Sequence, residues 1–279
     1  MRVACWQAGQ RPAERGLVAR LRDAAAKAAG EGADLLVTPE LSAVGYHLGR
    51  ARTTDLAEPA DGPLRETMSR LAASAGLAVV YGWPEAAGGG VYNAVQLIDA
   101  HGEVAAHYRK THLYGDFDTA TFLPGDRPVV QARVGGVTVG LLICYDVEFP
   151  EIVRAHALRG TELLAVPTAL SRPWELVART LVAARAFESQ LFIAYTNWVG
   201  TAPDGYCGLS RVVGPDGLVI AASEPAPAAT PPTTGDGKAD GEALLVADVD
   251  PAALAAARRL TPYLGDRRPE LYGDLTGPA

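Results

Sequence analysis

Three reactive side chains, Glu40, Lys110 and Cys144, lie at the ends of short apolar segments that the sequence predicts to be strands. Cys144 stands where the strand 137–143 ends and a helix is expected to begin, so the positive end of a helix dipole would lower the pKa of its thiol. Backbone N–H groups at such a turn can also stabilise an oxyanion. A thiol, a carboxylate and an ammonium at three strand ends would suit acyl transfer, as nucleophile, general base and cation facing the oxyanion.

Each of these side chains also has an ordinary structural interpretation. Free cysteines are among the most buried residues, so Cys144 alone is equally well a small core residue. Glu40 alone is more often a helix N-cap anchor, and Lys110 alone is more often solvated. The two other thiols are expected to be unreactive, because Cys5 lies inside the first predicted strand and Cys207 lies in a polar loop without an activating neighbour.

The elements that must position these residues are short apolar segments alternating with helical stretches. Strands are predicted at 3–8, 35–37, 77–81, 94–98, 104–108, 129–134, 137–143, 163–166, 191–195, 210–213, 218–221 and 244–248. Helices are predicted at 14–29, 63–75, 149–158 and 174–188. This pattern predicts an α/β fold in which helices cover a sheet and strand ends carry the chemistry.

One segment, 224–241, is rich in Pro, Ala, Thr and Gly and has no large apolar side chain. It cannot bury enough surface to offset its ordering entropy, so we predict a mobile loop inserted into a single domain that spans 1–260. The remaining residues, 261–279, include Tyr263, Leu264, Leu271 and Tyr272, which is too apolar for a solvated tail. We expect this tail to dock on a partner subunit.

The composition excludes several classes of protein. The 279 residues carry 25 basic and 32 acidic side chains, and this net charge of −7 disfavours nucleic-acid binding. Three cysteines cannot form a disulfide framework, and the histidines and cysteines show no metal-binding spacing. No signal-peptide or membrane-spanning pattern is found, so we expect a cytoplasmic protein with no membrane partner.

Three motifs together resemble the carbon–nitrogen hydrolase, or nitrilase, superfamily. They are Thr38-Pro39-Glu40-Leu41, Tyr108-Arg109-Lys110-Thr111-His112-Leu113 and Leu142-Ile143-Cys144-Tyr145-Asp146, with Lys110 70 residues after Glu40 and Cys144 34 residues after Lys110. The resemblance implies a four-layer α-β-β-α sandwich, a homodimer or higher homo-oligomer, and neither a metal nor an organic cofactor. It also implies that Cys144 is the nucleophile, Glu40 the general base, and Lys110 with the backbone N–H of Tyr145 the groups that stabilise the tetrahedral intermediate.

Further motifs are similar to the R-amidase-like group of aliphatic amidases within that superfamily. They are Tyr145–Glu151, Val166–Leu170, Ala178–Leu181 and Ala184–Glu188. The resemblance implies hydrolysis of a small aliphatic primary amide through a thioester, with an ω-amino or guanidino amide as one possibility, and it makes a nitrile substrate less expected. The residues placed near the family's substrate loops are Tyr46, Tyr145, Glu148, Thr168, Trp174 and Trp198, although the aromatic ones are also ordinary packing residues. Asp146, Glu148 and Glu175 near the expected mouth could attract a cationic substrate.

The sequence departs from the family at the second glutamate that many members carry before a Phe-x-Pro-Gly turn. That turn is Phe122–Gly125 here, and Asp118 occupies the position of the glutamate. Aspartate is shorter by one methylene, about 1.5 Å of reach, yet it could still orient Lys110 or the substrate. Alternatively, Asp118 is a solvated loop residue and Asp116 or Glu148 takes the role.

Two rival functions remain open at this point. An N-carbamoyl amino acid hydrolase would need an arginine for the substrate carboxylate, and the sequence does not clearly supply one. A non-catalytic interaction module on the same fold would fit the departure at Asp118, but intact Glu40, Lys110 and Cys144 speak against it.

Overall fold

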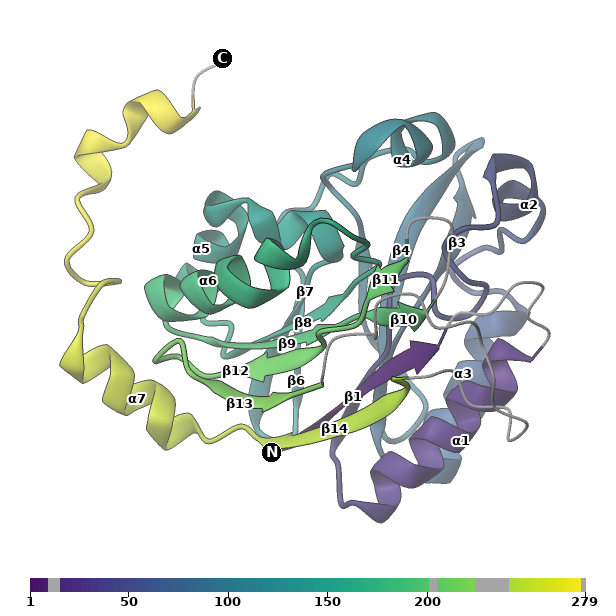
Figure 1. Cartoon of the computed structure of the whole chain (residues 1–279), viewed down its shortest axis with the longest axis horizontal. Helices are drawn as coiled ribbons and strands as arrows, with labels where there is room; N and C mark the ends of the chain where they lie inside the picture. Colours follow the sequence, from purple (N-terminus) through teal and green to yellow (C-terminus); the bar gives the residue numbers. More distant parts are fainter. Residues whose placement is uncertain (10–15, 201–204, 224–240, 277–279) are drawn as a thin grey trace.

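A computed structural model describes residues 1–9, 16–200, 205–223 and 241–276 of the chain (Figure 1). The described residues form two β-sheets that pack against each other, with helices over both outer faces. The first sheet has eight strands, which are β1 (Arg2–Gly9), β2 (Leu35–Val37), β3 (Ala78–Ala87), β4 (Gly90–Ile98), β5 (Val104–Arg109), β10 (Trp198–Gly200), β11 (Tyr206–Cys207) and β14 (Ala243–Asp248). The second has six, which are β6 (Gln131–Val134), β7 (Val137–Leu141), β8 (Leu163–Pro167), β9 (Phe192–Thr196), β12 (Arg211–Val213) and β13 (Val219–Ala222).

The helices in the described ranges lie mainly on the two outer faces of these sheets. They are α1 (Leu17–Gly30), α2 (Arg50–Asp55), α3 (Pro63–Ala75), α4 (Gly115–Thr121), α5 (Pro150–Leu158), α6 (Val182–Ser189) and α7 (Pro251–Leu260), with short helical turns η1 (Cys144–Glu148), η2 (Val177–Leu181), η3 (Pro269–Leu271) and η4 (Gly273–Thr276). Helices α1 and α3 cover the first sheet, while α5 and α6 cover the second. The expected α-β-β-α sandwich is therefore confirmed.

Strand order places the carboxyl ends of the parallel strands together. The first sheet has the order β11-β10-β1-β2-β3-β4-β5, with β14 paired to β1, and the second has the order β13-β12-β9-β8-β7-β6. The neighbours β1, β2 and β3 run parallel, as do β7, β8 and β9. Side chains at the ends of parallel strands meet at one edge of a sheet, which is where this class of fold collects its chemistry.

Strand β1 is buried on both of its faces. Successive side chains of a strand point to opposite faces, so Val3 and Cys5 join the core between the sheets while Ala4 and Trp6 face α1 and α3. The predicted apolar stripe of α1 packs against that second face, and its leucines are buried. Full burial of one such leucine is worth about 2 kcal/mol of stability.

The predicted strands are all found, and several differ in length. Strands β3 and β4 extend further than predicted, because they form one long antiparallel hairpin. The predicted helix 174–188 begins one residue later and includes the π-helical turn η2, and Cys144 is followed by the single turn η1 before α5 begins at Pro150. Helices α2, α4 and α7 and strands β10 and β11 were not predicted.

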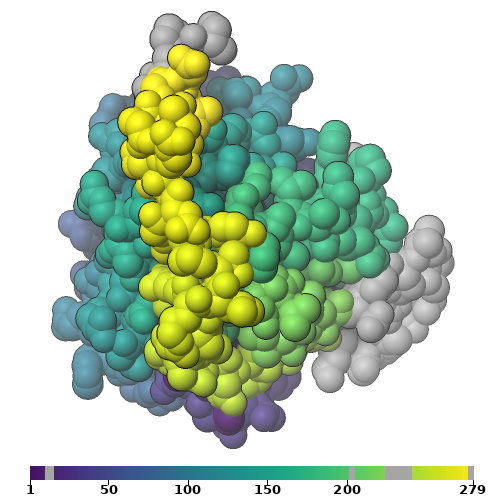
Figure 2. Space-filling model, turned by 90° about the vertical axis from the view of Figure 1, so that its left-hand side faces the viewer, coloured from purple at the N-terminus to yellow at the C-terminus, as the bar shows by residue number. Residues whose placement is uncertain are grey.

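Parts of three predictions lie outside the described residues. They are the first two residues of the predicted helix 14–29, nearly all of the predicted loop 224–241 and the last three residues of the predicted tail 261–279. After α7, residues 261–276 extend along the side of the molecule that α5 and α6 form (Figures 1 and 2). None of the helices in the described ranges is both long enough and apolar enough to cross a bilayer.

Candidate active site

The predicted catalytic residues lie within three residues of the carboxyl ends of strands in both sheets. Glu40 follows β2, Lys110 follows β5 and Cys144 follows β7. The backbone N–H of Glu40 donates to the carbonyl oxygen of Thr168, just after β8, at 3.3 Å. This bond joins the strand ends of the two sheets, so residues more than 100 positions apart share one site.

Lys110 is held between two carboxylates in the interior. Its Nζ donates to Glu40 Oε1 at 2.7 Å and to Asp118 Oδ2 at 2.6 Å, and all three side chains are fully buried. Two anions and one cation leave this cluster with a net negative charge when all three groups are ionised. Asp118 is thus not a solvated loop residue, whereas Asp116 on the same helix α4 is exposed.

The two oxygens of the Glu40 carboxylate have different surroundings. Oε1 accepts hydrogen bonds from Lys110 Nζ and from Asn93 Nδ2, each at 2.7 Å. Oε2 is buried and has no hydrogen-bond partner in the part of the chain that the structure describes. The Trp198 indole Nε1–H donates to the backbone carbonyl of Glu40 at 2.8 Å, which fixes the main chain at the same residue. Oε2 is therefore the oxygen available to receive a proton.

Asn93 is a site residue that the sequence reasoning missed. It lies in β4, and its side chain is fully buried. A carboxamide within an otherwise apolar strand is a detectable signal, because a buried polar side chain needs a partner. The partner itself, 53 positions earlier in the chain, depends on the packing of β4 beside β3 and the loop after β2.

Burial and charge set the protonation states of the three groups. Burial raises the pKa of Glu40 above its ordinary value, and Lys110 opposes part of that rise. Burial alone would lower the pKa of Lys110, but the charges of Glu40 and Asp118 outweigh it and raise that pKa well above its ordinary value. Lys110 therefore remains a cation at neutral pH.

The pKa of the Cys144 thiol is raised, whereas the sequence-based expectation was that it would be lowered. Burial, with the charge of Glu40 added, raises the pKa of Cys144 well above its ordinary value. Only the single turn η1 begins at Cys144, and α5 begins six residues later, so the thiol does not lie at the start of a long helix whose dipole could offset this rise. A thiol in this state needs a base to remove its proton before it can attack.

Cys144 sits at a sharp turn in the backbone. Its φ is +47°, in the left-handed region that costs an ordinary residue about 1–2 kcal/mol. The turn is held by a hydrogen bond from the N–H of Leu142 to Ala165 O and by one from the N–H of Asp146 to Ile143 O, each at 3.1 Å. Ile143 is fully buried, and Cys144 is partly buried and packs against the core between the sheets.

The Phe122–Gly125 turn supports Lys110. The N–H of Gly125 donates to the carbonyl oxygen of Lys110 at 2.8 Å, and a Cβ at Gly125 would lie only 2.3 Å from Arg109 O. Only glycine permits this close approach. Between Lys110 and this turn, α4 brings Asp118 back to the ammonium, where its Oδ2 also accepts from the N–H of Tyr114 at 3.1 Å.

The six predicted substrate-binding residues divide into three groups. Three of them bond to the framework of the site: Tyr46 OH donates to Asp118 Oδ1 at 2.7 Å, Thr168 Oγ1 donates to Val166 O, and Trp198 donates to Glu40 as described above. Tyr145 and Glu148 lie in η1 beside Cys144. Trp174 is 51% exposed, and within the described residues no hydrogen bond or ring contact joins it to the catalytic side chains.

The acidic residues expected near the mouth also differ from one another. Asp146 is fully buried and bonded on both oxygens, so it cannot attract a substrate from solvent. Glu175 pairs with Arg172 at 3.4 Å. Glu148 is half-buried, and burial raises the pKa of its carboxyl, an effect that Arg185 and Lys110 partly oppose.

The other two thiols are ordinary core residues. Burial raises the pKa of Cys5 to about 12 and that of Cys207 to about 11. The prediction that Cys207 lies in a polar loop is wrong, because it belongs to β11 and its Sγ contacts Leu170 O at 3.3 Å. Pairing with β10 buries the residue, which local sequence did not reveal.

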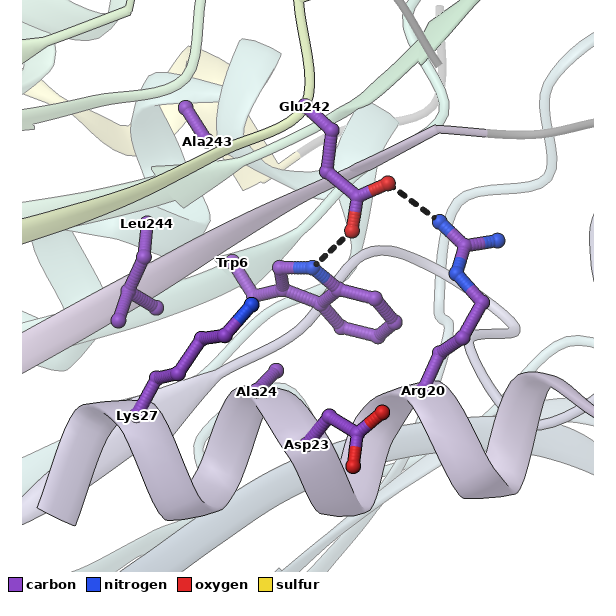
Figure 3. Close-up of a pocket in the computed structure, with 8 residues that line it drawn as sticks. All are labelled: Trp6, Arg20, Asp23, Ala24, Lys27, Glu242, Ala243 and Leu244. Carbon is purple, nitrogen blue, oxygen red and sulfur yellow. Dashed lines mark hydrogen bonds and ion pairs between the residues drawn. The ribbon is translucent and has the colours of Figure 1, made fainter. Parts of the chain in front are cut away.

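A separate pocket of about 330 Å³ lies between α1 and β14, away from these residues (Figure 3). Glu242 accepts from Trp6 Nε1 at 3.1 Å and pairs with Arg20 at 2.7 Å, so this carboxylate ties β14 to β1 and α1. Among the described residues, the lining of this pocket includes no cysteine, serine, threonine or histidine, and it mixes cationic with anionic side chains. Its geometry supports a structural role.

Comparisons with known proteins agree with this geometry. The model of the family described as carbon-nitrogen hydrolase matches residues 2–259. A Pseudomonas protegens protein named "Hydrolase in pqqF 5'region" is 42% identical over 279 residues, covering 99% of this chain and 92% of its own. An (R)-stereoselective amidase from a Pseudomonas species is 38% identical over 261 residues, covering 93% and 88%.

Solved structures give the same result. The crystal structure of an amidase from a Nesterenkonia species is similar with a TM-score of 0.79 at 34% identity, covering 99% of this chain and 96% of the other. A cysteine-to-alanine variant of that amidase was solved in complex with butyramide. In a glutamate-to-leucine variant, the acetamide moiety of fluoroacetamide is covalently added at the active-site cysteine.

Proposed function

Because this chain belongs to the carbon–nitrogen hydrolase family and is an amidase, we propose that it hydrolyses a small aliphatic primary amide to a carboxylate and ammonia. The observation that carries the proposal is a pair of buried ion pairs, Glu40–Lys110 and Lys110–Asp118, beside Cys144. The Nesterenkonia amidase, of the same fold, was solved with butyramide, a short aliphatic amide.

The first half-reaction transfers the acyl group to Cys144. Oε2 of Glu40 takes the thiol proton as Sγ attacks the amide carbon, and the carbonyl oxygen becomes an oxyanion. Lys110 Nζ and the backbone N–H of Tyr145 stabilise that oxyanion. Glu40 then gives its proton to the amide nitrogen, the C–N bond breaks, and ammonia leaves a thioester on Cys144.

The second half-reaction returns the enzyme to its resting state. Glu40 removes a proton from water, whose oxygen attacks the thioester carbon. The C–S bond breaks, and Glu40 returns the proton to Sγ. One water is consumed, and one carboxylic acid and one ammonia are formed.

The test is ammonia release from butyramide by wild-type protein and by Cys144→Ala. The variant should keep the fold, measured by circular dichroism, and lose turnover by at least about 10³-fold, since removal of a nucleophile leaves only residual catalysis. Iodoacetamide should label Cys144 before Cys5 and Cys207, whose thiols are buried. Activity near wild type in Cys144→Ala would contradict the mechanism.

We further propose that the preferred amide carries a distal cation, such as an ω-amino or guanidino group. Glu148 supports this, because its carboxylate lies in η1 four residues after Cys144 and has no hydrogen bond or ion pair within the described residues. The charges of Arg185 and Lys110 act on this carboxylate without forming an ion pair with it, so it favours a cationic substrate and repels a carboxylate. This disfavours an N-carbamoyl amino acid as the substrate. It also disfavours an amide that carries a carboxylate, such as the one in the name of the relative 2-oxoglutaramate amidase.

Three substrates of matched length separate these options: 5-aminopentanamide, hexanamide and adipamate. One partly exposed charge pair is worth about 1 kcal/mol, so kcat/KM should favour the cationic over the neutral amide about fivefold. Glu148→Gln should remove that preference, whereas Glu151→Gln, exposed on α5, should not. Equal rates for all three amides would exclude the cationic substrate and leave the hydrolase function intact.

We also propose that the protein forms a homodimer through the face of α5, α6 and the C-terminal residues. Tyr263 packs against Phe187 of α6 with ring centroids 5.6 Å apart, while Leu271 and Leu275 remain more than half exposed. Exposed leucines on an extended arm are typical of a segment that packs on a second chain. Light scattering should give the mass of two chains, and Leu271→Asp with Leu275→Asp should lower it. A single-chain mass for the wild type would contradict the dimer.

A cytoplasmic location remains a prediction from the sequence. The 224–241 loop within a 1–260 domain is likewise a proposal, which limited proteolysis would test by cleavage within that segment.

A further inference from the structure

Asp146 is a buried carboxylate with an unusual number of hydrogen-bond donors. Its Oδ1 accepts from Thr111 Oγ1, from the backbone N–H of His112 and from His112 Nδ1, each at 2.9 Å. Its Oδ2 accepts from Tyr108 OH at 2.8 Å and from the backbone N–H of Ile143 at 3.1 Å. The side chain is fully buried, so solvent does not compete for these bonds.

The donors come from two chain segments that carry different parts of the active site. Thr111 and His112 directly follow Lys110, and Ile143 directly precedes Cys144. Oδ1 therefore holds the chain after Lys110, while Oδ2 holds the chain before Cys144 and also the Tyr108 side chain at the end of β5. The two segments are more than 30 residues apart in sequence, and this carboxylate bridges them.

An aromatic contact spans the same two segments. The His112 ring stacks on Phe149 with centroids 3.9 Å apart, and the N–H of Phe149 donates to the carbonyl oxygen of Asp146 at 3.2 Å. The turn that contains Cys144 and Tyr145 is thus tied to the exit of β5 by the Asp146 side chain and by this stack. Both contacts hold the segment in which Cys144 keeps its strained φ of +47°.

From this geometry we propose that Asp146 is a positioning residue that fixes the Cys144 turn relative to Lys110. The proposal rests on the proposed amide hydrolysis and adds a residue that touches neither substrate nor thiol. In that reaction, the oxyanion must reach Lys110 Nζ and the N–H of Tyr145 at the same moment. Because those donors belong to the two bridged segments, their separation depends on the bridge.

The role requires a carboxylate and not merely a polar side chain of that size. An ionised carboxylate is acceptor-only, whereas asparagine replaces one acceptor by a donor. In one orientation, the asparagine NH₂ would face the N–H of Ile143. In the other, it would face the N–H of His112. The first orientation loosens the turn before Cys144, and the second breaks the bridge to residues 111–112; in both cases a buried donor is left facing a donor.

The experiment compares Asp146→Asn with wild type in butyramide hydrolysis, with rates normalised to the folded concentration. A displacement of about 1 Å at a reacting group costs on the order of 10²-fold. We expect kcat to fall 10- to 100-fold while KM changes less than threefold, and the rate of Cys144 alkylation by iodoacetamide to change as well. Asp99→Asn is the matched control, since Asp99 Oδ1 accepts from the N–H groups of His101 and Glu103 at the far end of the β4–β5 hairpin. That control should lower thermal stability and leave kcat unchanged.

A second variant keeps the test decisive if Asp146→Asn does not fold. Thr111→Val removes one donor to Oδ1 from a partly exposed position, and kcat should fall about fivefold with KM unchanged. A purely structural role for Asp146 predicts lower melting temperatures with wild-type kcat in both variants, and that result would overturn the proposal. Failure of the wild type itself to release ammonia from any amide would instead overturn the proposed function.

Discussion

Replacing Asp118 by asparagine should change both the pH dependence and the rate of amide hydrolysis. Asp118 Oδ2 and Glu40 Oε1 contact the same Nζ at 2.6 and 2.7 Å, so these oxygens lie at most about 5 Å apart. At an effective dielectric constant of about 20, two like charges at about 5 Å repel each other by about 3 kcal/mol. The Asp118 anion raises the pKa of Glu40, so its removal lowers that pKa.

The direction of the effect on the pH–rate profile follows from the role of Glu40. A general base must be ionised to accept a proton, so the acid limb of kcat/KM should move to lower pH. With a Brønsted slope of about one half, about half of that 3 kcal/mol is added to the barrier to proton transfer, so the weaker base is about tenfold slower on the plateau. Loss of one of the two anchors of Lys110 adds to this, so we expect a total loss of 10- to 100-fold.

The assay is ammonia release from butyramide between about pH 4 and 9, with thermal melts to show that each variant folds. Asp116→Asn is the matched control, because it removes a carboxylate from the same helix at an exposed position and should leave the profile unchanged. Asp118→Glu keeps the charge and should keep the acid limb near its wild-type position. A folded Asp118→Asn protein with an unchanged plateau, or with an acid limb moved to higher pH, would refute the reasoning.

Three further predictions follow from buried contacts. In Asn93→Ala, Glu40 Oε1 loses a hydrogen-bond donor that lowers the pKa of Glu40. The acid limb of the pH–rate profile should therefore move to higher pH, and kcat should fall about tenfold. A shift to lower pH, as expected for Asp118→Asn, would contradict this. Burial lowers the pKa of the His156 imidazole to about 4. The neutral imidazole therefore contributes up to about 3 kcal/mol to the free energy of unfolding above about pH 6.5, and this contribution should be lost as pH falls through 4. Urea unfolding should show this loss in wild type and less of it in His156→Gln, and equal slopes in both proteins would rule out His156 as the cause. In Gly125→Ala, the Cβ would lie 2.3 Å from Arg109 O, so we expect about 1–3 kcal/mol of destabilisation and a lower kcat. Gly30→Ala is the control, because its Cβ would lie in open space, and it should change neither stability nor kcat.

Local patterns in the sequence determined the elements and the residues that do the chemistry. Alternation over two residues and the 3.6-residue stripe fix which faces of a strand or helix are apolar, and these patterns need no knowledge of distant contacts. They predicted the strands that end at Glu40, Lys110 and Cys144, and the motifs there indicated the superfamily. The length of the β3–β4 hairpin and the short helix α4 were missed, because pairing and packing extend or create elements beyond their local preference.

Only the tertiary structure decided how those residues work together. That Glu40 Oε2 is the free oxygen depends on Asn93, 53 residues away, and that Asp146 bridges two segments depends on how β5 lies relative to β7. The protonation of Cys144 was predicted in the wrong direction, because the pKa of a thiol follows its burial and its charged neighbours. Hydrogen-bond partners and burial are properties of register and packing between distant segments, whereas residue type and spacing are properties of the chain itself.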